Sequence, residues 1–145
     1  MGLLRDNDRV QLQKEFEQLT NPVKLVFFSQ ATDCDFCPIT KQILDEVASL
    51  SDKIQIQTFD FATDRAQVEQ FKIARVPAIA IVRAGMPDRD YGIRYYGVPS
   101  GFEFAALVGD ILDVSAGDSG LNAASRAALA QLQEPVHLQV FSTST

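Results

Sequence analysis

Tryptophan is absent from the 145-residue sequence, and histidine, cysteine and methionine are scarce, with one, two and two residues. Two cysteines cannot build the disulfide framework that holds small secreted domains together. A closed zinc or iron–sulfur site needs about four ligands, so a metal would have to be shared between two subunits, as in a metal-bridged dimer. The single histidine, His137, lies in a late strand-like segment without a ligand motif, and we expect it to be structural or exposed.

Long apolar runs and an excess of basic charge are also missing. There is no stretch of about 18 apolar residues and no charged segment leading into an apolar one at the start. We therefore expect neither a membrane span nor a signal peptide, and a cytoplasmic location. The net charge of −6 disfavours nucleic acid, whose phosphates attract a basic surface. A domain of this length buries roughly two thirds of its unfolded surface, so its core needs no disulfide or metal.

Hydrophobic periodicity predicts alternating helices and strands. Leu12, Phe16 and Leu19 recur at the spacing of one helical face. The apolar run at 23–29 has the composition of a strand buried on both faces. Later patterns predict a helix at 38–50, a strand at 53–61, a short helix at 64–73, a hairpin of strands at 77–82 and 91–97, and a helix at 101–114. A βαβ unit followed by a hairpin and a helix indicates an α/β fold with a mixed central sheet covered by helices.

Both cysteines, Cys34 and Cys37, stand in the loop after the first predicted strand. Sites in such sheets lie at the carboxyl ends of the parallel strands. If Cys37 opens the next helix and Cys34 occupies its cap, the two side chains share a face and can form a disulfide. The unpaired N–H groups at the helix start stabilise a thiolate. We therefore expect Cys34 to be the nucleophile of thiol–disulfide exchange and Cys37 to resolve the mixed disulfide.

Two carboxylates flank the predicted nucleophile. Asp33 and Asp35 disfavour a thiolate at Cys34, so we hypothesise a reductant rather than a strong oxidant. The same carboxylates make Cys34 an awkward residue to bury, which disfavours a chance pair of apolar cysteines. In a reducing compartment a close cysteine pair indicates redox chemistry or a metal, not a structural disulfide.

A second motif is the Val76–Pro77 pair just before the third predicted strand. Together with the preceding C-x-x-C, strand and helix, it resembles the thioredoxin and glutaredoxin fold. The resemblance implies that Pro77 is cis and packs against the active-site disulfide, and that the backbone of Val76 pairs with the substrate. Phe28 stands six residues before Cys34, where thioredoxins carry a buried aspartate, and Phe36 before the second cysteine is more similar to glutaredoxin.

The chain as a whole resembles more closely the glutaredoxin-like protein disulfide oxidoreductases, which have two thioredoxin-fold units in tandem. The residues that carry this resemblance are the C-x-x-C, Arg75-Val76-Pro77 and the segment YGIRYYGVPSGFEF at 91–104. The tandem thioredoxin-like domain of the alkyl hydroperoxide reductase flavoprotein is a more distant relative, whose first unit lacks the cysteines.

The resemblance implies a thiol–disulfide oxidoreductase that exchanges or reduces protein disulfides in cell redox homeostasis and electron transport, without a bound cofactor. Substrate contacts would come from Arg75, Val76, Pro77 and Phe36. Electrons would come from an NAD(P)H-dependent flavoprotein reductase, and peroxiredoxins are candidate clients. Glutathione use stays open. Arg75 or Lys41 could hold the glutathione carboxylates, and the loop at 97–101 could offer backbone N–H groups. That loop is, however, equally explained as a helix start capped by Ser100. The alternatives are an electron-relay, docking or redox-sensing module without turnover, or the metal-bridged dimer.

The end of the chain repeats its beginning. Residues 18–32 and 131–145 align without a gap at eight of fifteen identical positions, Gln18, Leu19, Pro22, Val23, Leu25, Phe28, Ser29 and Thr32 matching Gln131, Leu132, Pro135, Val136, Leu138, Phe141, Ser142 and Thr145. Similarity at a constant offset indicates a repeated unit. We therefore expect a thioredoxin-like domain at 1–120 and, at 121–145, the incomplete start of a second unit, with a helix at 121–133 and a strand at 136–142. A first strand without its sheet leaves backbone groups unpaired, so 134–145 is expected to be disordered, loosely packed or paired with a neighbouring molecule.

Overall fold

The computed structural model describes residues 2–143 of the chain. Its elements, in chain order, are α1 (Asp6–Phe16), β1 (Val23–Ser29), α2 (Cys37–Ala48), β2 (Ile54–Asp60), α3 (Arg65–Gln70), β3 (Ala78–Arg83), β4 (Arg89–Tyr96), α4 (Phe102–Ala116) and α5 (Ala123–Ala130). The helices and strands predicted up to residue 114 are all present in the predicted order, and β1 has the predicted bounds.

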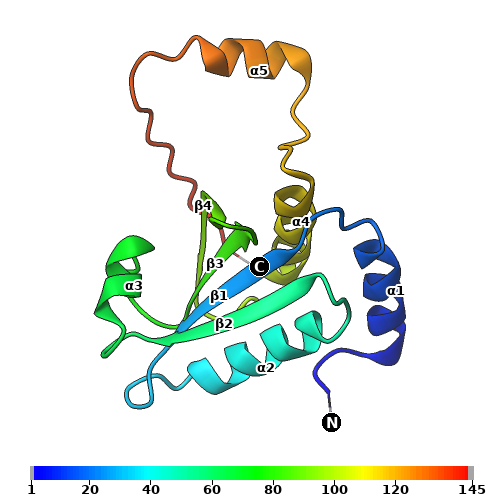
Figure 1. Ribbon diagram of the computed structural model, residues 1–145, viewed down its shortest axis with the longest axis vertical. Coiled ribbons are helices and arrows are strands. Elements are labelled where there is room, and N and C mark those ends of the chain that lie inside the picture. Colours follow the sequence, from blue (N-terminus) through cyan, green and yellow to red (C-terminus); the bar gives the residue numbers. More distant parts are fainter. Residues whose placement is uncertain (1, 144–145) are drawn as a thin grey trace.

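The sheet has the order β2-β1-β3-β4 (Figure 1). β1 pairs in parallel with β2, from Val23 opposite Ile54 to Ser29 opposite Asp60. β1 pairs antiparallel with β3, and β3 pairs antiparallel with β4. The predicted α/β fold with a mixed sheet is therefore confirmed. The two apolar runs become the inner strands β1 and β3, where burial on both faces favours continuous apolar sequence.

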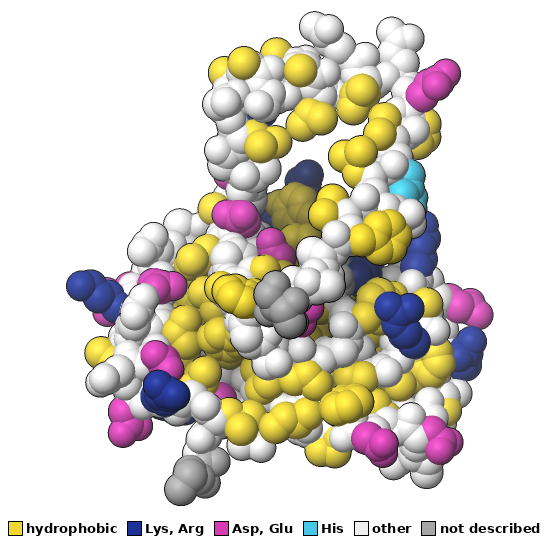
Figure 2. All heavy atoms as spheres, turned by 180° about the vertical axis from the view of Figure 1, so that it is seen from behind, with side chains coloured by type: hydrophobic (Ala, Val, Ile, Leu, Met, Phe, Trp, Pro, Cys, Tyr) yellow, Lys and Arg dark blue, Asp and Glu magenta, His cyan; other side chains and the backbone are white. Residues whose placement is uncertain are grey.

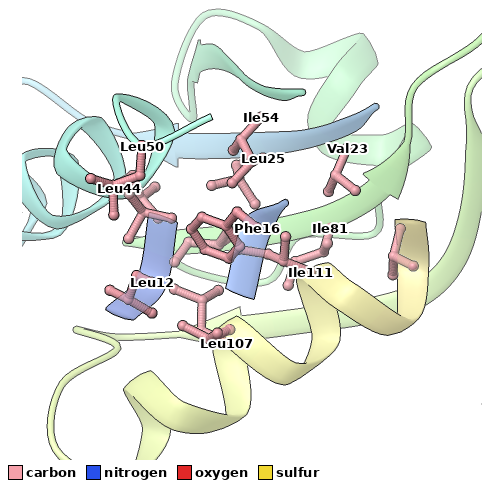
Figure 3. Close-up of a cluster of buried hydrophobic side chains, with 14 of the residues drawn as sticks. Leu12, Phe16, Val23, Leu25, Leu44, Leu50, Ile54, Ile81, Leu107 and Ile111 are labelled. Atoms are coloured by element: carbon pink, nitrogen blue, oxygen red, sulfur yellow. The ribbon is translucent and has the colours of Figure 1, made fainter. Parts of the chain in front are cut away.

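One core lies between the sheet and the helices α1, α2 and α4. Figure 3 shows Leu12 and Phe16 from α1 in one cluster with Leu107 and Ile111 from α4, and Ile81 from β3 lies beside Ile111. A smaller cluster under α3 fills the other face of the sheet, and it consists of Val26, Phe28, Val68, Phe71, Ile73, Ala78, Ala80 and Val82. β1 thus contributes alternate side chains to both cores, which holds it firmly at the centre of the molecule.

Ser115 near the end of α4 joins this helix to the turn before β1. The buried Ser115 hydroxyl accepts the backbone N–H groups of Thr20 at 2.9 Å and Asn21 at 3.0 Å, and it donates to the Asn21 carbonyl at 2.7 Å. Buried backbone polar groups are costly when unpaired. This hydroxyl therefore fixes the point where the chain enters β1, at the pole opposite the cysteines.

Two local expectations are wrong, and one cis bond was not expected. Ser100 does not cap α4, because the N-cap is Gly101 with φ 61°, in the left-handed region that glycine tolerates, and no side chain caps the helix. The Met86–Pro87 bond is cis, which the sequence did not suggest. Within the described part of the chain, no strand forms at 136–142.

The last segment projects from the body as an arm, which we define as residues 121–143 (Figure 1). The predicted helix at 121–133 is shorter, α5, and it buries no residue. Figure 2 shows hydrophobic atoms along the arm. From Leu129 in α5 onward, the arm exposes a series of large apolar side chains, namely Leu129, Leu132, Val136, Leu138, Val140 and Phe141. Thr145, the last match of the repeat, lies outside the described residues. No helix among residues 2–143 has the length and apolar character needed to cross a membrane.

Candidate active site

Cys34 and Cys37 form a disulfide at the start of α2, with 5.4 Å between their Cα atoms. The chain leaves β1 at Ser29, turns through Asp33 with φ 57°, and enters the helix at Cys37, whose N–H donates to the Cys34 carbonyl at 3.2 Å. The expectation that Cys34 occupies the helix cap is wrong, because Phe36 is the N-cap residue. Cys34 lies one turn earlier, in the loop, as a nucleophile approached from solvent requires.

The two cysteines differ in burial. Cys37 is 5% exposed and belongs to the main core, whereas Cys34 is half-buried at the edge of that core. Phe36, between them, leaves 63% of its surface exposed. Asp33 and Asp35 are also exposed. The site therefore offers one accessible sulfur, one protected sulfur and a projecting aromatic ring.

Pro77 lies at the same edge of the sheet as the disulfide. The Val76–Pro77 bond is cis, as the resemblance implied. Ala78 opposes Phe28 in the antiparallel β1–β3 pair, so the residues just before Ala78 lie beside the end of β1, where the cysteine loop begins. Val76 and Cys34 both pack against the main core. The Pro77 carbonyl accepts the Gly97 N–H at 3.0 Å, which joins this loop to the loop at 97–101.

Arg75 is exposed and lies over an aromatic ring. Its guanidinium carbon is 4.7 Å from the centre of the Tyr96 ring, a cation–π arrangement that holds the charge near the Pro77 loop. No ion pair in the described part of the chain involves Arg75. Tyr95, also in β4, donates to Asp110 at 2.5 Å. Burial and this carboxylate raise the pKa of the Tyr95 phenol.

A pocket of about 280 Å³ opens beside the disulfide. Its lining combines both sulfur-bearing residues with polar side chains, and consists of Phe27, Ser29, Gln30, Ala31, Cys34, Cys37, Pro38, Lys41 and Thr58. Phe27, not Phe28, is thus the β1 residue beside the cysteines, whereas Phe28 belongs to the cluster on the opposite face of the sheet. The position six residues before Cys34, Phe28, is therefore one residue away from the one that lies beside the cysteines. A shift of one residue along a strand moves the side chain to the opposite face of the sheet.

Phe27 and Thr58 are site residues that the sequence did not predict, and Lys41 was expected only as a contact for glutathione. The signal for Lys41 was its place four residues after Cys37 in a predicted helix, which puts both side chains on one face. The signal for Thr58 required the strand register, since Thr58 opposes Phe27 in the parallel pair. A larger hollow of about 520 Å³, lined by Asp110, Asp113 and Asp118 among others, contains neither cysteine.

No group of three or more His, Cys, Asp or Glu that could hold a metal occurs among residues 2–143. Both sulfurs are bonded to each other, so neither is a free ligand in this form. His137 is exposed on the arm.

Comparisons with known proteins agree with this geometry. No family model matches the chain. An alkyl hydroperoxide reductase subunit of Pseudomonas aeruginosa is 30% identical over 121 residues, 83% of this chain and 20% of that protein. A probable thioredoxin of Methanothermobacter thermautotrophicus is 28% identical over 92 residues, 63% of this chain and 98% of that protein.

Among solved structures, the protein disulfide oxidoreductase of Aeropyrum pernix superposes with a TM-score of 0.75 at 26% identity, covering 88% of this chain and 55% of that one. The chain thus spans a fifth of the Pseudomonas reductase protein and about half of the oxidoreductase. The chain is thus similar to members of both groups that the sequence resembled.

The chain has a thioredoxin-like fold with a Cys34–Cys37 disulfide and a cis-proline, and it is similar to proteins of the disulfide oxidoreductase class. Within that class it is similar both to the protein disulfide oxidoreductase of Aeropyrum pernix and to the alkyl hydroperoxide reductase protein of Pseudomonas aeruginosa.

Proposed function

We propose that the chain reduces or exchanges disulfides of client proteins through Cys34 and Cys37, as part of cell redox homeostasis. In the reduced form the Cys34 thiolate attacks a client disulfide. A mixed disulfide forms between Cys34 and one client sulfur, and the other client sulfur leaves as a thiolate that takes up a proton. Cys37 then loses its proton to water and attacks the Cys34 sulfur. The Cys34–Cys37 bond closes, the second client thiolate leaves, and two electrons have passed to the client.

The unequal burial of the two sulfurs is the observation that carries this proposal. A half-buried Cys34 can meet a client disulfide, and a 5% exposed Cys37 can meet only Cys34. The start of α2 favours negative charge at the sulfurs. Exposed Phe36 offers an apolar contact to the client, the Val76 backbone next to cis Pro77 offers pairing groups, and the Arg75 cation offers an anchor for an acidic group.

The proposed partners follow from the need to reduce the Cys34–Cys37 disulfide again after each turnover. We assign the electron supply to an NAD(P)H-dependent flavoprotein reductase and name peroxiredoxins as candidate clients. The similarity to a subunit of an alkyl hydroperoxide reductase supports this transfer of electrons from a reductase to a peroxiredoxin. We keep the cytoplasm as the compartment, because a reducing environment keeps the dithiol available. If glutathione binds, Arg75 or Lys41 would hold its carboxylates.

Reduction of insulin by dithiothreitol tests the exchange activity directly. We expect the chain to accelerate insulin precipitation, because only a turnover catalyst increases that rate. An unchanged rate would contradict the proposal. Equilibration of the Cys34–Cys37 couple in a glutathione redox buffer gives the reduction potential, and a value far below the cytosolic poise would mark a reductant.

An electron-relay module is the second candidate, and the similarity to one fifth of a larger reductase protein favours it. A relay would accept electrons from a covalently or tightly associated flavoprotein and pass them to one partner. It would leave insulin reduction unchanged while its disulfide still cycles.

We propose further that residues 121–145 belong to a second thioredoxin-like unit. The repeat at a constant offset supports this, and so does the exposure of its apolar residues. Leu132, Val136 and Leu138 are exposed, while their counterparts Leu19, Val23 and Leu25 are buried in the main core. The arm therefore has the sequence pattern of a buried segment, although its apolar side chains are exposed.

A further inference from the structure

Resolution of the mixed disulfide requires a deprotonated Cys37, and the structure makes this difficult. Cys37 is 5% exposed and packs in the main core. Burial in apolar surroundings raises the pKa of a thiol. The flanking Asp33 and Asp35 add negative charge on the solvent side. A compensating positive charge near Cys37 would restore the thiolate.

One cation lines the pocket that reaches both sulfurs. Lys41 follows Cys37 by four residues in α2, so the two side chains are neighbours on one helical face. The other polar residues of the pocket are neutral: Ser29, Gln30 and Thr58. The pocket therefore holds a cation and no carboxylate beside the sulfurs.

Lys41 is the single cation of α2, and it has a carboxylate partner on the same helix. The Lys41 ammonium contacts Asp45 at 2.5 Å, and the two side chains are 39% and 52% exposed. Asp45 lies a further turn away from Cys37, so at the sulfur its negative charge offsets the Lys41 charge only in part. On β2, Asp60 accepts the N–H groups of Ala62 and Thr63 and faces its own turn.

We propose that Lys41 lowers the pKa of the Cys37 thiol and thereby speeds the resolving step. Lys41 acts through its charge and is a positioning residue, not a catalytic residue. The inference rests on the proposed exchange function. Within that function it assigns to Lys41 an electrostatic effect on one step, the attack by Cys37. The bonds made and broken are those of the resolving step: Cys37 gives its proton to water, the Cys34–Cys37 bond forms, and the client thiolate leaves.

The aromatic disulfide dithiobis-nitrobenzoate separates the two steps by stopped-flow absorbance. Reduced protein releases a first nitrothiobenzoate when Cys34 attacks, at a rate that depends on reagent concentration. It releases a second when Cys37 closes the ring, at a rate that does not. The pH dependence of the second phase gives the pKa of Cys37 in the mixed disulfide.

Lys41→Gln should raise this pKa by about one unit, the low end of the shift that a neighbouring opposite charge causes. The second phase should slow only about three-fold at neutral pH, because a thiolate of higher pKa is also the better nucleophile. Lys41→Arg should restore the wild-type profile. Lys14→Gln, a lysine on the remote helix α1, is the matched control and should change nothing.

An unchanged second-phase pKa in Lys41→Gln would overturn the inference, whatever its effect on stability. The same holds if Lys41→Arg behaves like Lys41→Gln. Failure of the proposed function looks different: insulin reduction would be absent in the wild type, while the two nitrothiobenzoate phases and their pH profiles would still be measurable.

Discussion

At the scale of single residues, the site is an asymmetric pair of sulfurs. Cys34 lies in a loop near solvent, and Cys37 lies in the first turn of α2 within the core. The asymmetry assigns the roles, because an attacking thiolate must be reached by a client and a resolving thiol need reach only its neighbour.

Substituting each sulfur by oxygen tests this assignment. Cys34→Ser should abolish insulin reduction and mixed-disulfide formation, because a hydroxyl is a poor nucleophile at neutral pH. Cys37→Ser should leave attack intact and trap clients as mixed disulfides, visible by non-reducing electrophoresis and mass spectrometry. Both variants should keep the wild-type circular dichroism. Trapping by Cys34→Ser instead would mean that the roles are reversed.

The carboxylates beside Cys34 give a second prediction. Asp33 and Asp35 are exposed, so water and salt weaken their effect on the sulfur. Asp33→Asn with Asp35→Asn should lower the pKa of the Cys34 thiolate by a few tenths of a unit, roughly the scale of exposed charge pairs, and should raise the reduction potential. Ultraviolet absorbance of the thiolate against pH measures the pKa. Asparagine also tolerates the positive φ of residue 33, so a rise in pKa would refute the reductant hypothesis and would not report misfolding.

At the scale of elements, α2 is held from both ends. Its start carries the disulfide, and its last turns bind the N-terminal segment through Glu46. The Glu46 carboxylate accepts the N–H groups of Leu3 at 2.6 Å and Leu4 at 3.0 Å, and Arg9 contacts it at 3.3 Å. These backbone hydrogen bonds, with Leu4 first and Leu3 next, lower the pKa of Glu46. Gln42 and the Arg9 charge lower it further, and burial opposes them.

This contact should make stability depend on pH. A carboxyl whose folded pKa is lowered stabilises the fold fully above its ordinary pKa of 4.5, and that contribution is lost as the pH falls through the lower folded value. Glu46→Gln should reduce the free energy of unfolding by about 1 kcal/mol at neutral pH. The difference between the variant and the wild type should shrink as the pH falls below 4.5 and through the lower folded pKa. Urea unfolding at several pH values measures it. Glu134→Gln, on the exposed arm, should show no such difference at any pH.

At the scale of the whole molecule, a compact thioredoxin-like body carries an arm that buries little. The arm leaves α4 at the pole opposite the cysteine loop (Figure 1), and α5 buries no residue. Its apolar residues repeat positions that are buried in β1, so the arm has the pattern of a strand without sheet partners.

Deleting residues 121–145 should therefore leave the body intact. We expect the same unfolding midpoint in urea within error, and the same rate of insulin reduction, because no buried side chain of the main core comes from the arm. The deletion should also reduce self-association in size-exclusion chromatography, since exposed apolar strands favour pairing between chains. A large loss of stability would show that the arm belongs to the fold of the first unit.

Local sequence patterns determined much of this structure. The apolar run from Val23 to Ser29 predicted β1 with its observed bounds, and the position of Cys34 and Cys37 after that run predicted a disulfide site at the carboxyl end of a parallel strand. The resemblance at Val76–Pro77 also anticipated the cis bond. These features depend on residues close in the chain, where periodicity and turn chemistry act directly.

Only the tertiary structure decided which side chains surround the sulfurs. Phe27 instead of Phe28 lies beside Cys37, because the strand register sets the face and a single-residue step reverses it. Thr58 joins the pocket through the β1–β2 pairing, a contact between residues far apart in sequence. The segment at 136–142 has a strand sequence much like that of β1, yet forms no strand in the described chain. A strand requires a partner to pair its backbone groups, and no local pattern can supply that partner.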